Sequence, residues 1–283
     1  MKKILITGGS GLLGTYLIKE KPEGYDLYPT YYNGLPQWRM LDITDKLSIY
    51  RLFSDFKFDV VIHTAGLGNV DFCEQVPHIS DLVNYEGTKN LIDILNELKH
   101  KPLFIHISTN AVYDGNNPLY TEESEQRPIN KYGFSKKLAE EYVAARYDGS
   151  YLIVRPFMLF GWSGKTGRKN WLDIITEALC HNREMDLIDD IFWQPTSISF
   201  AAKAIYSLID KAECNTSFNL SQGETMSLYD FACLINPKVF SPISHAEFKT
   251  TAKRPIDTSY DISKLSQYIE VPTVKNEIER MLK

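Results

Sequence analysis

The feature that most constrains this chain is a glycine-rich turn near its N-terminus, between a strand pattern and a helix pattern. Residues 2–7 read KKILIT and predict a buried strand, while residues 12–19 read LLGTYLIK and predict a helix. Gly8, Gly11 and Gly14 lie between and within them as G-x-x-G-x-x-G. The first glycine permits a tight turn, the second lets a ligand approach backbone N–H groups, and the third lets the helix pack close to the strand. The alternative is an ordinary strand-to-helix turn.

The alternation of strand and helix patterns continues to about residue 155. Strand patterns lie at 2–7, 25–32, 59–65, 103–108 and 151–155, and helix patterns lie at 12–19, 46–56, 78–99 and 132–146. Continuous apolar strands between amphipathic helices are typical of a parallel sheet that is covered on both faces. The sequence therefore predicts an α/β fold with a doubly wound, Rossmann-like parallel sheet.

The regular alternation weakens after Pro156. Further helix patterns lie at 171–180, 199–209 and 227–235, and a glycine-rich basic loop, GWSGKTGRKN, covers 161–170. We predict a dinucleotide-binding domain over 1–155 and a smaller, mainly substrate-binding lobe over 156–283, with about 194–220 returning to the first domain. Because ligands of open α/β sheets bind at the carboxyl ends of the strands, the lobe is expected to cover that edge.

Composition excludes several classes of protein. A net charge of −5 argues against non-specific nucleic-acid binding. No apolar stretch has membrane-spanning length, and the apolar run of MKKILITGGS is too short for a signal peptide. The cysteines are scattered without a C-x-x-C pair, so we expect no metal site but buried, reduced thiols in a cytoplasmic protein. They are Cys73, Cys180, Cys214 and Cys233.

The glycine turn predicts a dinucleotide whose pyrophosphate lies against Gly8, Gly11, Leu12 and Leu13 at a helix N-terminus. An acidic residue usually ends the second strand and binds the ribose hydroxyls of NAD. Here residues 28–33 read YPTYYN, without a carboxylate.

The residues that follow the second strand bear on the choice of cofactor. Arg39 could bind a 2′-phosphate, so NADP(H) is favoured and NAD(H) is the alternative. Asp42 is a candidate for the adenine amino group and, equally, for a helix N-terminal cap.

Tyr132 and Lys136 form a second candidate site in the segment NKYGFSKK. Four residues apart on a helix, they face the same way. An ammonium near a phenol favours the phenolate and lowers its pKa, which suits proton exchange at a carbonyl or alcohol oxygen. Thr109, at the end of the strand pattern LFIHIST, could hold that oxygen. A Tyr-x-x-x-Lys pair alone is more often an exposed pair without a function, but the glycine turn upstream favours the catalytic interpretation.

Several segments together resemble extended short-chain dehydrogenases/reductases. They are TGGSGLLG, HTAG at 63–66, VNYEGTKNL at 83–91, STNAVYDG at 108–115 and YGFSK at 132–136. GRKNWL, QPT at 194–196 and RPIDTSYD at 254–261 bring the chain closest to the dTDP-4-dehydrorhamnose reductase branch. The resemblance covers nearly the whole chain and implies that Thr109, Tyr132 and Lys136 are the active-site hydroxyl, acid and lysine, with Lys136 also on the nicotinamide ribose.

The resemblance also implies further ligand contacts. Cofactor contacts are expected at Ile43, Thr64, Ala65 and Gly66. Substrate contacts are expected at Val70, Asp71, Asn110, Asn170 and Arg254. The branch usually has an acidic residue where this chain has Asn110, which leaves the identity of the sugar open.

Each substrate residue has a structural alternative. Asp71 could cap a turn, and Asn170 is equally a helix cap. Lys165, Arg168 and Lys169 could bind a diphosphate, although surface lysines are usually only solvated. Arg254 is the stronger candidate for that contact. His63 and His106 stand in apolar strands and are expected to be buried and hydrogen-bonded rather than metal ligands.

The sequence thus predicts an NAD(P)H-dependent reductase of a keto-sugar nucleotide. One alternative is a nucleotide-sugar epimerase or dehydratase with bound NAD. Another is a non-catalytic, reductase-like regulatory subunit. The expected partner is a small-molecule nucleotide-sugar, with no nucleic acid and no membrane, and a homodimer is kept as a hypothesis.

Overall fold

The computed structural model describes residues 1–32, 38–164, 169–237 and 240–283. Lys165, Arg168 and the end of the YPTYYN segment lie outside the described residues. Within them, one sheet carries strands in the order β11-β6-β5-β4-β1-β2-β3, and every neighbouring pair is parallel. Its strands are β1 (Lys2–Thr7), β2 (Tyr25–Tyr31), β3 (Arg39–Met40), β4 (Val60–His63), β5 (Leu103–Ile107), β6 (Tyr151–Pro156) and β11 (Thr216–Leu220).

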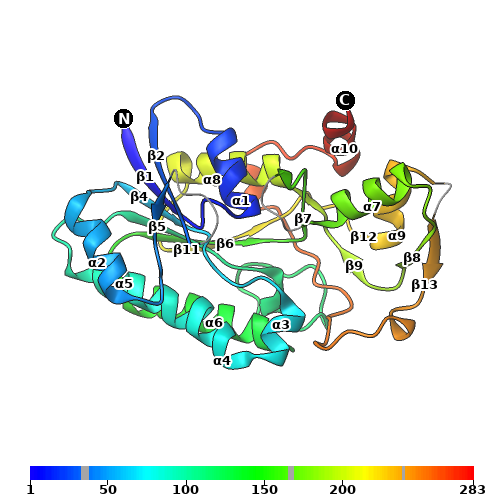
Figure 1. The fold of residues 1–283 in the computed structure, drawn as a ribbon, viewed down its shortest axis with the longest axis horizontal. Coiled ribbons are helices and arrows are strands. Elements are labelled where there is room, and N and C mark those ends of the chain that lie inside the picture. The colour runs from blue at the N-terminus through cyan, green and yellow to red at the C-terminus, as the bar shows by residue number, and fades with distance from the viewer. Residues whose placement is uncertain (33–37, 165–168, 238–239) are drawn as a thin grey trace.

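Helices cover both faces of this sheet (Figure 1). One face carries α1 (Leu12–Lys19) and α8 (Ile198–Lys211), which pack against each other. The other carries α2 (Lys46–Asp55), α3 (Val70–Gln75), α4 (Pro77–Ser80), the π-helix η1 (Asp81–Glu86), α5 (Gly87–Glu97) and α6 (Lys131–Arg146). Each face has its own apolar core, which is why the strands read as continuous apolar runs.

A smaller lobe with its own core lies beside one end of the sheet (Figure 1). Its helices are α7 (Trp171–Cys180), α9 (Leu228–Ile235) and α10 (Val274–Leu282). Three two-stranded sheets accompany them, made of β7 (Leu159–Phe160) with β10 (Thr196–Ser197), β9 (Phe192–Trp193) with β12 (Met226–Ser227), and β8 (Met185–Ile188) with β13 (Phe240–Ile243). The predicted doubly wound fold with a C-terminal lobe is confirmed.

The strand order places a topological switch point between β1 and β4. From β1 the chain runs outward through β2 and β3, and it then returns to build β4, β5 and β6 on the other side. The chain therefore leaves β1 and β4 in opposite directions, and open α/β sheets bind ligands at the carboxyl ends of the strands at such a switch point.

Two sequence expectations are corrected by the structure. The single helix predicted over 78–99 is three segments, α4, η1 and α5, because a six-residue π-turn is hard to distinguish from an α-helix by apolar spacing. The expectation that the cysteines are buried is wrong for Cys180 and Cys214, which are exposed, whereas Cys73 is buried. Cys180 ends α7 and Cys214 precedes β11, so both lie where the chain leaves the core.

Candidate functional site

The glycine turn is built for close approach. Gly8 has φ +68°, in the left-handed region, and a Cβ atom there would lie 2.8 Å from the Cα of Ala65 in the loop after β4. Thr64 closes the same junction, since its hydroxyl donates to the backbone oxygen of Thr7 at 2.7 Å. The loops after β1 and β4 thus pack against each other at the carboxyl ends of these two strands.

The start of α1 has no side-chain cap. Its N-cap is Gly11, which offers no side-chain hydrogen bond to the first turn. The first N–H groups of a helix have no intrahelical acceptor, and α1 therefore presents those of Leu12 and Leu13 to an anion. By contrast, α2 and α6 are capped by the side chains of Asp45 and Asn130.

A row of polar side chains crosses the sheet beneath α5 and α6. Thr7 on β1, His63 on β4 and His106 on β5 are register partners on adjacent strands. His63 is held at both ring nitrogens, by the Thr7 hydroxyl at 2.7 Å and by the Thr88 hydroxyl at 3.1 Å. Burial, and then the charge of Lys136, lowers the pKa of His63 to about 3, so this ring is neutral at physiological pH.

Lys136 is buried against the end of β5, with only 5% of its surface exposed. Its Nζ donates to the Ile107 carbonyl oxygen at 2.7 Å and lies 3.3 Å from the Nε2 of His106. Burial lowers the pKa of Lys136 from 10.5 to about 8, and the carboxylate of Glu140 opposes the change. Lys136 is therefore a cation in a site that favours its neutral form.

Gly133 brings the start of α6 onto the loop after β5. A Cβ atom at Gly133 would lie 2.0 Å from the carbonyl oxygen of Ala111, so no larger residue fits. Tyr132, which is partly buried, precedes Gly133, and Thr109 lies two residues before Ala111. The helix packing thus places the segment that carries Tyr132 and Lys136 against the loop that carries Thr109.

Thr109 lies two residues after β5, in extended backbone, and is the N-cap of a short 3-10 helix, η2 (Asn110–Val112). Its hydroxyl oxygen accepts from the Ala111 N–H at 3.2 Å, and its side chain is largely buried. Asn110 donates to the Thr258 hydroxyl at 2.8 Å. Asn110 therefore links this loop to the C-terminal segment and supplies no carboxylate beside Thr109.

Asn84 organises the site and was not singled out by the sequence reasoning. It lies in the π-helix η1, where its Oδ1 accepts from the Leu67 N–H at 2.8 Å. Its Nδ2 donates to the Ser135 hydroxyl at 3.1 Å, next to Lys136. One buried amide therefore fixes the loop after β4 relative to α6. The sequence signal for this role was Asn84 itself, a poor helix former on the buried face of a predicted helix.

Two predicted substrate residues bind each other. The Nη2 of Arg254 donates to Asp71 Oδ2 at 2.8 Å, and Asp71 Oδ1 accepts from the Ala252 N–H at 2.9 Å. The Nη1 of Arg254 is buried and has no hydrogen-bond partner among the described residues. The structural alternative for Asp71, a turn cap, is not met, since Asn69 caps α3 and Val70 is its partly buried first residue.

Comparison with known proteins gives the family. The model of the RmlD substrate binding domain matches residues 1–283. The chain belongs to this family. The predicted membership among extended short-chain dehydrogenases/reductases near dTDP-4-dehydrorhamnose reductase is thereby confirmed.

Three proteins illustrate how varied the relatives of this RmlD-family chain are. Methionine adenosyltransferase 2 subunit beta of Xenopus laevis is 27% identical over 277 residues, which cover 94% of this chain and 82% of the relative. A probable low-salt glycan biosynthesis reductase of Haloferax volcanii is 26% identical, with 96% and 95% covered. The structure of dTDP-4-dehydrorhamnose reductase from Bacillus anthracis in complex with NADP has a TM-score of 0.89 and 26% identity, covering 99% of this chain and 98% of that one.

Other predicted contacts of this RmlD-family chain have structural partners. Arg39 lies beside the end of β2, paired with Asp55 at 2.8 Å, so a 2′-phosphate would have to displace that ion pair. The alternative that Asp42 caps α2 is wrong, because Asp45 does so, and Asp42 instead accepts from the N–H of Thr44 at 2.8 Å.

The remaining predicted residues divide between core and surface. Ile43 is buried and its carbonyl accepts from Asn90, whereas Gly66 is exposed. Asn170 caps α7 in a capping box with Asp173, as its structural alternative predicted. Lys169 pairs with Glu177 at 2.5 Å.

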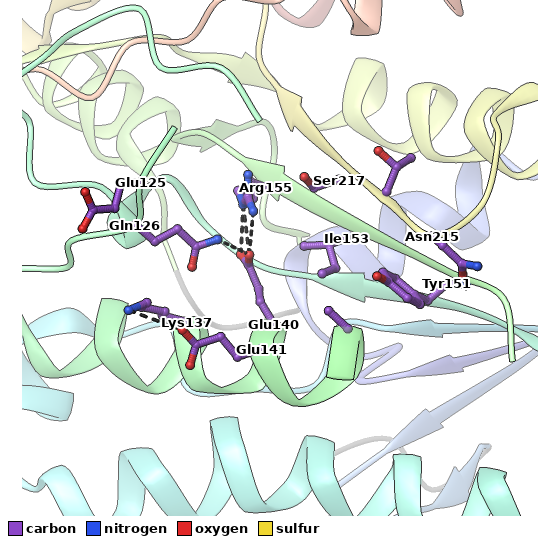
Figure 2. Close-up of a pocket in the computed structure, with 12 residues that line it drawn as sticks. Glu125, Gln126, Lys137, Glu140, Glu141, Tyr151, Ile153, Arg155, Asn215 and Ser217 are labelled. Carbon is purple, nitrogen blue, oxygen red and sulfur yellow. Dashed lines mark hydrogen bonds and ion pairs between the residues drawn. The ribbon is translucent and has the colours of Figure 1, made fainter. Parts of the chain in front are cut away.

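A pocket of about 550 Å³ lies elsewhere, between α6, β6 and β11 (Figure 2). Its buried cation, Arg155, is held by Glu140 through contacts of 2.7 to 3.1 Å, and its Nη1 donates to the Tyr113 hydroxyl at 2.8 Å. None of the predicted site residues lines it. Its charges are satisfied within the protein, so the pocket is not the candidate active site.

The described residues contain neither a membrane-spanning helix nor a cluster of metal ligands. No helix there is long and apolar enough to cross a membrane. No group of three or more histidine, cysteine, aspartate or glutamate side chains there is arranged to hold a metal ion.

Proposed function

We propose that this chain is an NAD(P)H-dependent reductase of a keto-sugar nucleotide. The observation that supports the proposal is the packing of the start of α6, with Tyr132 and a buried Lys136, on the loop after β5 that carries Thr109. The bound dinucleotide would supply hydride to a carbonyl carbon. Family membership and the NADP complex of a relative with the same fold support this assignment.

The chain's own residues supply the proton and the electrostatics. Tyr132 donates a proton to the carbonyl oxygen as negative charge develops there. The Thr109 hydroxyl donates a hydrogen bond to the same oxygen. Lys136 holds the ribose and, as a cation near the phenol, favours proton loss from Tyr132. We assign the dinucleotide to residues 1–155 and the sugar nucleotide mainly to 156–283, with about 194–220 belonging to the first domain, as the place of β11 and α8 supports.

Arg254 is our candidate for the diphosphate of the substrate. A guanidinium binds phosphate oxygens through paired, charge-assisted hydrogen bonds. Its Nη2 is held by Asp71, whereas its Nη1 is buried and has no hydrogen-bond partner among the described residues, so a diphosphate that displaces the cover over Nη1 would supply the missing acceptor. NADP(H) is the favoured cofactor, because no carboxylate ends β2 and Arg39 lies beside that strand end.

The test is turnover of NADPH with a panel of keto-sugar nucleotides, repeated with Tyr132→Phe. The variant keeps the ring and removes the hydroxyl, so kcat should fall by roughly 10²–10⁴-fold while NADPH affinity is unchanged. Turnover close to that of the wild type would show that Tyr132 is not the proton donor.

A second candidate is a non-catalytic regulatory subunit that keeps the dinucleotide site. It is favoured by the relatives that are named as a subunit of methionine adenosyltransferase. Binding of NADPH without turnover of any panel member would support it. An epimerase with bound NAD would instead interconvert sugar nucleotides without net consumption of NADPH. A dehydratase is disfavoured, because Asn110 provides no acid-base carboxylate beside Thr109.

A further inference from the structure

The hydrogen bonds of Lys136 leave one donor available. An ammonium group has three N–H donors and no acceptor. The Ile107 carbonyl oxygen, at 2.7 Å, and the Nε2 of His106, at 3.3 Å, take two of them. Both partners belong to β5, so one strand holds the ammonium from below.

The same contact sets the proton position on His106. Because an ammonium can only donate, the Nε2 of His106 must accept, and the ring proton is then on Nδ1. That Nδ1 is buried and has no hydrogen-bond partner among the described residues. A buried donor without a partner is unfavourable. His63, in the same polar row, has hydroxyl partners at both nitrogens. Packing alone therefore does not account for His106.

We propose that His106 is a positioning residue, which together with the Ile107 carbonyl holds two N–H groups of Lys136 and leaves the third for a hydroxyl of the cofactor ribose. The inference rests on the proposed function, which assigns Lys136 to that ribose. His106 acts through Lys136 and does not itself touch the substrate.

The charges around Lys136 are consistent with this role. Burial lowers the pKa of both His63 on β4 and His106 on β5, so both rings are neutral, and a neutral ring can accept from the ammonium. Glu140, on α6 itself, is the carboxylate that favours the charged lysine. Tyr132 lies one turn earlier on the same helix.

The experiment compares His106→Phe with His106→Gln. Phenylalanine keeps a ring but removes the acceptor, and the glutamine amide can restore an acceptor near the Nε2 position. Phe104→Leu is the matched control, because Phe104 is buried in the same strand and its ring stacks on His106 at 6.4 Å, yet no hydrogen bond to Lys136 involves it. Affinity for NADPH is measured by nucleotide fluorescence between pH 6.5 and 9.5.

We expect NADPH affinity to fall about 10-fold or more in His106→Phe, as for loss of a hydrogen bond to a charged group. His106→Gln should recover most of the affinity, and Phe104→Leu should lose less than His106→Phe. Wild-type affinity should weaken as pH rises through the pKa of Lys136, and the midpoint should move to lower pH in His106→Phe, because loss of the acceptor disfavours the charged lysine.

A second measurement uses the wild-type protein, so it requires neither turnover nor a variant that folds. Long-range ¹H–¹⁵N spectra of histidine-labelled wild-type protein at pH 7 should show His106 with its proton on Nδ1. A proton on Nε2 would overturn the proposal, as would affinity in His106→Phe equal to that of Phe104→Leu. Since turnover is not measured, a chain that binds NADPH but reduces no sugar nucleotide would refute the proposed function and not this inference.

Discussion

Replacing Lys136 by methionine should make the ligand-free protein more stable at neutral pH. The structure buries this side chain and lowers its pKa from 10.5 to about 8, yet at pH 7 the group is still charged. One pKa unit is worth about 1.4 kcal/mol, so the buried charge costs roughly 3 kcal/mol of unfolding free energy. Methionine fills a similar volume, but the Ile107 carbonyl and the Nε2 of His106 each lose a hydrogen bond worth about 1 kcal/mol. A net gain of about 1 kcal/mol is expected.

The sign of this effect fixes its pH dependence. Because the pKa of Lys136 is lower in the folded chain, the unfolded chain binds more protons between pH 8 and 10.5. The wild-type free energy of unfolding therefore gains over that of the variant as pH rises through this window. The advantage of Lys136→Met is complete below about pH 8 and is lost above about pH 10.5.

Urea unfolding of the ligand-free proteins at pH 7 and pH 9.5 measures this difference. Lys137→Met is the control, because Lys137 lies on the same helix, is more exposed and pairs with Glu141 at 3.4 Å. That change should stay within about 0.5 kcal/mol. The reasoning fails if Lys136→Met is less stable than the wild type at pH 7, or if the stability difference is the same at both pH values. The same variant should bind NADPH more weakly, which would show that stability is given up for function at this residue.

Three further predictions follow from individual contacts. Gly133→Ala should lower the free energy of unfolding by about 1–3 kcal/mol or more in urea titrations, because the new Cβ would lie 2.0 Å from the Ala111 oxygen. An unchanged unfolding midpoint would contradict the packing argument. In steady-state kinetics, Arg254→Ala should raise the KM for the sugar nucleotide about 10-fold or more. Asp71→Asn releases Arg254 from its ion pair and should lower this KM a few-fold. If both variants change the KM in the same direction, the ion pair only supports the loop. Arg39→Ala should weaken NADPH about 10-fold in fluorescence titrations and leave NADH unchanged, and equal effects on both would remove Arg39 from the cofactor site.

Much of the fold could be predicted from local sequence pattern. The apolar run of β1, the glycine turn and the start of α1 are adjacent in the chain, so their geometry follows from residues a few positions apart. The spacing of Tyr132 and Lys136 fixes their shared helix face in the same way. Local chemistry also sufficed for Asn170, whose capping box needs only Asp173 three residues on. It was ambiguous for Asp42, because Asp45 competes for the same helix start.

The partners of these residues were decided only by tertiary structure. Lys136 meets His106 because parallel pairing carries β5 beneath α6, 30 residues away in sequence. Asp71 meets Arg254 across 183 residues, and no local pattern records that pairing. The sequence by itself thus determined which groups of the chain can donate, accept or carry charge. The packing of helices on the sheet decided which of them are buried together, and burial is what lowers the pKa of Lys136 and leaves Nδ1 of His106 without a partner among the described residues.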